Sequence, residues 1–137
     1  MLRPVAEYAC TVFHSSLTDE QDEAIEKLQN QALKCIYGPF ISARKMRDSA
    51  GLETLRSRRI MICDKFARKC LSNPRFQHWF PLKASRTSTR GGKPREEFLE
   101  EKARCDRLFN SPIYYMRRRL NGKPGKTYGR RYSEYRQ

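Results

Sequence analysis

Hydrophobic residues recur with helical spacing through the first half of the chain. Between Arg3 and Phe13 they stand at positions 5, 8, 9, 12 and 13, the intervals of three and four that place side chains on one helix face. A longer stretch follows Thr18, which forms the first half of a capping box with Gln21, and ends at Gly38-Pro39. The pattern predicts helices over residues 4–14 and 18–37.

Two further helices are predicted before residue 80. Ser42 is suited to cap a short helix that ends at Gly51, and a longer helix is expected from about Thr54 to Ser72, where Asn73-Pro74 breaks it. We expect the four helices to form a small bundle over residues 4–80. The side chains expected to face its interior are Val5, Tyr8, Val12, Leu28, Leu33, Ile36, Leu55, Ile62 and Phe66.

After residue 81, apolar residues no longer recur with helical spacing over a long stretch. We interpret residues 82–95, rich in Ser, Thr, Gly, Lys and Arg, as a linker, and residues 96–121 as a basic arm with one or two short helices, the first over 96–109. Residues 122–137 are expected to be a disordered basic tail, and residues 1–81 the helical bundle. Because alternating apolar and polar positions are nowhere sustained, the predicted fold class is all-α.

The charge is unevenly distributed along the chain. There are 29 Lys and Arg residues against 15 Asp and Glu, and most of the net +14 lies after residue 80. Arginines there alternate with tyrosines, so that guanidinium groups are available for phosphates and aromatic rings for unpaired bases. This pattern predicts RNA or single-stranded DNA as the partner. The residues expected to bind it are Arg117, Arg118, Arg119, Arg130, Arg131, Tyr115, Tyr128 and Tyr132.

Motifs for catalysis are missing from the sequence. It has no paired-aspartate motif of a polymerase, no phosphate-binding Gly-rich loop and no His-Glu-x-x-His helix. Cys10 and His14 lie one helical turn apart, but we interpret them as a core thiol and a helix-end histidine, since no orienting carboxylate accompanies them. A zinc site would have to combine residues without a close-spaced pair, namely Cys63, Cys70, His78 and Cys105. We therefore expect no catalytic residue, metal, cofactor or small-molecule substrate.

The sequence also bears on location. It has no run of the about 18 apolar residues that a membrane span needs, and its N-terminus lacks the apolar core of a signal peptide. Five cysteines at irregular spacings do not suggest a disulfide framework. We expect an intracellular protein, nuclear or cytoplasmic, without a membrane partner.

A series of short segments, taken in order, carries a family resemblance. The segments are Arg3–His14, Leu17-Thr18, Gln29, Ala32-Leu33, Ile36–Gly38, Gly51–Leu55, Arg58-Arg59, Cys63–Ala67, Asn73-Pro74, His78, Phe80-Pro81, Ala103-Arg104, Ser111–Ile113, Tyr115-Met116 and Leu120-Asn121. Together they resemble the part of non-LTR, jockey-like retrotransposon reverse transcriptases that lies in or after the thumb. The sequence departs from that pattern at Thr11, Phe13 and Asn30-Gln31, and residues 122–137 match nothing in it.

The resemblance implies descent from an RNA-directed DNA polymerase whose endonuclease and palm are encoded upstream. The catalytic aspartates of that family have no matching positions in this chain. The expected function is therefore non-catalytic binding of RNA or single-stranded nucleic acid. Two alternatives stay open: a helical protein–protein interaction module, whose apolar faces once packed on the upstream domains of the reverse transcriptase and now meet a protein partner, and a non-functional remnant.

Overall fold

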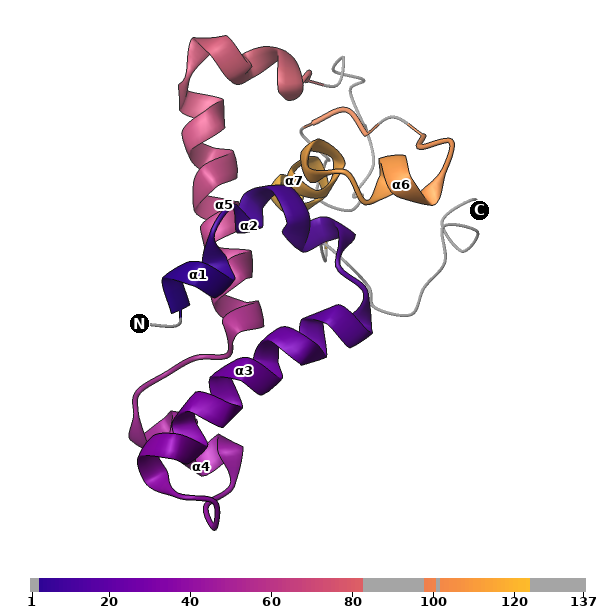
Figure 1. Cartoon of the computed structure of the whole chain (residues 1–137). Coiled ribbons are helices and arrows are strands. Elements are labelled where there is room, and N and C mark those ends of the chain that lie inside the picture. The colour runs from indigo at the N-terminus through magenta and orange to yellow at the C-terminus, as the bar shows by residue number, and fades with distance from the viewer. Residues whose placement is uncertain (1–2, 83–97, 101, 124–137) are drawn as a thin grey trace, which may run out of the picture.

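The computed structural model describes residues 3–82, 98–100 and 102–123, and it confirms the predicted all-α class (Figure 1). Within these ranges the extended pairing is confined to one isolated antiparallel bridge, between Leu82 and Phe98. The elements are α1 (Arg3–Glu7), α2 (Cys10–Phe13), the 3-10 helix η1 (His14–Ser16), α3 (Asp19–Tyr37), α4 (Ala43–Ser49), α5 (Leu55–Ser72), the 3-10 helix η2 (Pro74–Trp79), α6 (Asp106–Phe109) and α7 (Pro112–Leu120).

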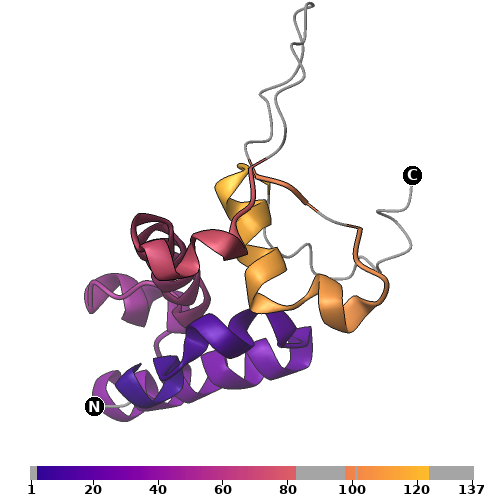
Figure 2. The ribbon, with the colours of Figure 1, turned by 90° about the horizontal axis from the view of Figure 1, so that it is seen from above.

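Helix α5 is the central element of the fold. It contacts α1, α2, α3, α7 and η2, so that the segments before and after it pack on the same helix (Figures 1 and 2). Helix α4 packs on α3, and this pair forms the lower end of the molecule in Figure 1. The helical segments of residues 3–72 therefore pack together, with α5 as the common partner of α1, α2 and α3.

Local signals set the helix boundaries as predicted. The capping box of α3 is formed: the Gln21 amide donates to Thr18 Oγ1 at 3.3 Å, and the Thr18 amide donates to Gln21 Oε1 at 3.0 Å. Side chains of Ser42 and Thr54 cap α4 and α5 in the same way. Gly38 ends α3 with φ of 87°, a conformation that a side chain would oppose. These caps depend on residues within one turn, which explains why the sequence alone predicts them.

The single helix predicted over residues 4–14 is wrong. Ala9 has a left-handed conformation, with φ of 52° and ψ of 25°, and divides the segment into α1 and α2. The break turns Cys10 inward, where it is buried, while Val5, Tyr8 and Val12 stay exposed to solvent by 79%, 81% and 64%. The apolar stripe on which the prediction rested therefore does not face α5.

The predicted interior is also wrong for Leu28 and Ile36 of α3 and for Phe66 of α5. Leu33 and Leu55 are buried as expected and Ile62 is partly buried, but Leu28, Ile36 and Phe66 are exposed. The buried line of α3 instead contains Asp22 and Gln29 besides Leu33. The helix presents this polar line to α5 because Asp22 forms an ion pair with Arg59.

The hydrophobic core lies at the other end of α5. It consists of Ala67, Cys70, Phe80, Phe98 and Met116, surrounded by the partly buried Leu71, Phe76, Trp79 and Leu120. Two of its members come from the stretch that was expected to be a separate arm, so α7 packs on the other helices instead of extending away from them. The helix predicted over residues 96–109 is restricted, in the described part, to Asp106–Phe109.

We predict that Met116→Ala lowers the free energy of unfolding by about 2–4 kcal/mol, because it leaves a cavity in this core. Urea unfolding of the full chain, followed by circular dichroism, measures the loss. Leu108→Ala is the control, since the Leu108 side chain is 37% exposed. A loss below about 0.5 kcal/mol for Met116→Ala, typical of surface sites, would show that α7 is not part of the core.

Candidate nucleic-acid interface

Three of the residues expected to bind nucleic acid are buried. Tyr115, Arg117 and Arg118 of α7 pack against other parts of the fold, with 3%, 8% and 6% of their surfaces exposed. The Tyr115 ring meets the buried His14 ring edge-on, at 5.4 Å between centroids. The expectation that these side chains are available to phosphates and bases is therefore wrong.

The buried arginines bind main-chain oxygens. Arg117 Nε donates to the Trp79 carbonyl at 2.7 Å, and Arg118 Nη1 donates to the Phe109 carbonyl at 2.9 Å. The Arg118 guanidinium also lies over the Phe109 ring, with Cζ 3.8 Å from its centroid. A guanidinium group can be buried in this way because its fixed fork of donors pairs with carbonyls and its plane stacks on rings. The arginine run is thus structural at these two positions.

Arg119 occupies the edge of the same helix. Its Nε and Nη2 atoms donate to the two carboxylate oxygens of Asp64 on α5, at 3.0 and 2.5 Å. This bidentate pair is partly exposed and ties α7 to α5. The remaining four residues of the predicted set, Tyr128, Arg130, Arg131 and Tyr132, lie outside the described residues, and their role stays a prediction.

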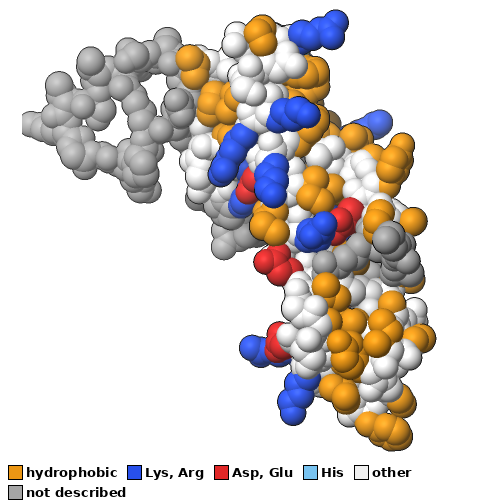
Figure 3. All heavy atoms as spheres, turned by 90° about the vertical axis from the view of Figure 1, so that its left-hand side faces the viewer, with side chains coloured by type: hydrophobic (Ala, Val, Ile, Leu, Met, Phe, Trp, Pro, Cys, Tyr) orange, Lys and Arg blue, Asp and Glu red, His pale blue; other side chains and the backbone are white. Residues whose placement is uncertain are grey.

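An exposed row of cations lies on the outer face of α5 and continues into η2. We call Lys65, Arg68, Lys69 and Arg75 the cationic ridge; the three on α5 are spaced by three and four residues and so share one helix face. Figure 3 shows Lys and Arg side chains gathered over this part of the surface. This arrangement is suited to contacting a chain of phosphates.

Few carboxylates oppose the ridge. Positions 65–95 contain nine Lys and Arg residues and no Asp or Glu. The preceding residue, Asp64, is bound by Arg119, which offsets its charge. At the other end of α5, Arg58 pairs with Glu7 at 2.6 Å. The acid-free run can be found in the sequence alone, whereas the predicted contacts lie on the arginine run of α7 and after it.

The buried ion pair between Asp22 and Arg59 was also missed. Arg59 has no exposed surface, and the Asp22 carboxylate lies 3.6 Å from Arg56 as well. The sequence feature that could have predicted the burial of Arg59 is helical periodicity. Arg59 falls in the buried line of α5, which is Leu55, Arg59, Cys63, Ala67 and Cys70. A basic residue in an otherwise apolar line points inward when a carboxylate meets it.

The thiols of Cys10 and Cys63 are buried in the contact of α2 with α5. Cys63 Sγ donates to the Cys10 carbonyl at 3.8 Å. Burial, together with a smaller effect of the Cys10 thiol, raises the pKa of Cys63 to about 12. Burial, and then Glu7, also raise the pKa of Cys10. Both thiols are therefore protonated at neutral pH and lack the thiolate that a nucleophile needs. In the described ranges, no three His, Cys, Asp or Glu side chains are placed to hold a metal.

The raised pKa of Cys63 predicts a loss of stability in alkali. Its folded-state pKa lies above the ordinary value of 9.0, so the contribution is complete below about pH 9 and disappears as the pH rises toward 12. We expect Cys63→Ala to reduce the fall in urea midpoint between about pH 7 and pH 11. Cys35→Ala, which removes an exposed thiol, is the control. Identical declines in the wild type and both variants would contradict the assignment.

Comparisons with known proteins identify no relative of this chain. No family model matches the chain, and neither the curated proteins nor the solved structures contain a significant match. Among the helices described, none is both long and apolar enough to cross a membrane.

Proposed function

We propose that the chain is a non-catalytic binding module for RNA or other single-stranded nucleic acid, and that the cationic ridge contacts the phosphate backbone. The observation that carries the proposal is the row Lys65, Arg68, Lys69 and Arg75, exposed on α5 and η2 within a sequence run free of acidic residues. Phosphate contacts supply affinity without reading sequence, so binding is expected to be insensitive to base order.

The resemblance to jockey-like reverse transcriptases supports the same proposed function. A segment downstream of the palm is suited to hold a template, primer or element RNA, while the polymerase chemistry belongs to aspartates that have no matching positions here. The proposal therefore includes no enzymatic activity and no cofactor. It places the protein inside the cell, in the nucleus or cytoplasm. Tyr128, Arg130, Arg131 and Tyr132 are proposed as further contacts.

A salt titration of RNA binding by the full chain tests this function. Each phosphate neutralised on a single strand contributes about −0.7 to the slope of log affinity against log salt. We expect a slope of about −3 or steeper if the four ridge cations each neutralise one phosphate. Absence of binding at low salt, or an affinity that does not change with salt, would contradict the proposal.

Exposed apolar side chains favour a second candidate, a protein–protein interaction module. Val5 on α1, Val12 on α2 and Tyr8 in the turn between them project into solvent, although valine side chains are usually buried. The partner suggested by the resemblance is an upstream domain of the reverse transcriptase. Co-purification with such a domain that Tyr8→Ser abolishes, together with absence of RNA binding, would favour this function over the first.

A further inference from the structure

The connection between α3 and α4 displays an aromatic ring. We call residues 38–42 the α3–α4 tip; within it, Phe40 is 99% exposed. The tip is fixed at both ends, because the Gly38 amide donates to the Lys34 carbonyl at 2.9 Å and Ser42 caps α4. Exposing a whole phenylalanine ring forgoes the free energy of burying it.

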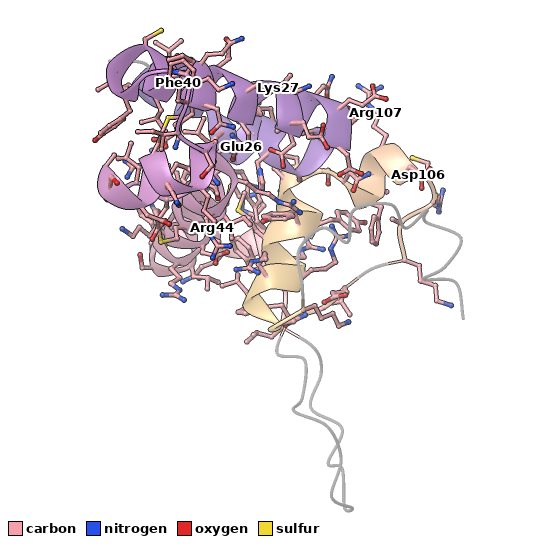
Figure 4. The ribbon with its side chains drawn as sticks, turned by 90° about the horizontal axis from the view of Figure 1, so that it is seen from below. Glu26, Lys27, Phe40, Arg44, Asp106 and Arg107 are labelled. Carbon is pink, nitrogen blue, oxygen red and sulfur yellow. The ribbon has the colours of Figure 1, made fainter. Side chains whose placement is uncertain are left out.

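Cations flank the tip in the sequence. Lys34 precedes the tip, Arg44 and Lys45 follow it, and all three are exposed. Figure 4 looks onto this end of the molecule and labels both Phe40 and Arg44. Positions 27–47 contain five Lys and Arg residues and no Asp or Glu. The segment that carries the ring is thus basic, and its charge is complementary to that of a polyanion.

We infer that the α3–α4 tip is a stacking site for an unpaired nucleobase, with the flanking cations holding the adjacent phosphates. The inference rests on the proposed function and narrows its ligand to strands with unpaired bases. Every base offers a face on which an aromatic ring can stack, whereas the bases of an intact duplex are already stacked on one another. The tip lies on different elements from the cationic ridge, so the two contacts can be removed separately.

The test compares Phe40→Ser with the full wild-type chain. The probe is a labelled RNA of about 20 nucleotides without self-complementarity, with the matching duplex as a second probe. Losing one stacked base should weaken single-strand binding about 5- to 150-fold and leave the salt slope unchanged, since no charge is removed. Duplex affinity should not change, and Phe40→Trp should retain single-strand binding. Val12→Ser, which also removes an exposed apolar side chain, should have no effect.

The possible failures are distinguishable. If the wild type binds RNA with the expected salt dependence but Phe40→Ser binds equally well, the inference is wrong and the proposed function stands. An equal loss for single strand and duplex would also overturn it, because stacking on an unpaired base would not be the cause. Capture of phosphatidylserine vesicles that requires Phe40, with unaltered RNA affinity, would assign the tip to lipid. If the wild type binds no RNA, the proposed function and this inference both fail.

Discussion

Asp22→Ala is expected to lower the free energy of unfolding by about 3–5 kcal/mol, because it leaves the guanidinium of Arg59 buried without its carboxylate. Small domains have a total of about 5–15 kcal/mol, so the variant should lose a large share of its stability. The pair also joins α3 to α5, and its loss should loosen the α3–α4 end of the molecule first.

Urea unfolding followed by circular dichroism measures this effect. Glu23→Ala is the matched control, since it removes an exposed carboxylate one position along the same helix. The double variant Asp22→Leu with Arg59→Met should recover most of the stability, because replacing both buried ions with apolar side chains avoids an unpaired charge. An Asp22→Ala variant as stable as Glu23→Ala would contradict the buried pair. So would a double variant no more stable than Asp22→Ala.

The helix boundaries could be predicted because their causes are local. Thr18 with Gln21, Ser42, Thr54 and Gly38 act through hydrogen bonds or backbone conformation within a turn of the chain. The break at Ala9 could not, because the residues around it have helical spacing and only packing on α5 selects the bent path.

The buried faces were harder to predict because polar residues occupy two of them. Asp22 and Gln29 line α3 and Arg117 with Arg118 line α7, where a hydrophobic pattern assigns solvent exposure. Each has a partner outside its own helix. Asp22 pairs with Arg59, Gln29 donates to the Glu53 carbonyl, and Arg117 and Arg118 donate to the carbonyls of Trp79 and Phe109. A hydrophobic pattern depends only on the type of each side chain. It does not show whether a polar side chain will find a hydrogen-bond partner elsewhere in the fold and can therefore be buried.

Composition predicted the kind of partner proposed for the site but not the position of the site on the fold. A basic, nucleic-acid-binding chain was predicted from the net charge, but Arg117 and Arg118 of α7 are buried, and the exposed cations of the ridge are on α5 and η2 instead. Whether a charge is accessible depends on tertiary packing, which explains the change of location. The distribution of acidic residues was the better guide, since none occurs between positions 65 and 95.

Removing the three ridge cations of α5 should have the largest effect on binding. The triple variant Lys65→Ala, Arg68→Ala and Lys69→Ala is expected to flatten the salt slope for single-stranded RNA by about two units, because three phosphate contacts are lost. The loss should be similar for RNAs of different sequence, since the contacts are to the backbone. These side chains are exposed, and the fold should be retained.

The matched control is the triple variant Lys102→Ala, Arg104→Ala and Arg107→Ala, which removes the same charge from exposed positions away from the ridge. Comparing the salt slopes of the two triple variants tests the central claim most directly. The ridge variant should lose about two units of slope and the control much less. Equal slopes for both triple variants would show that net charge, and not the cationic ridge of α5, determines the binding of nucleic acid.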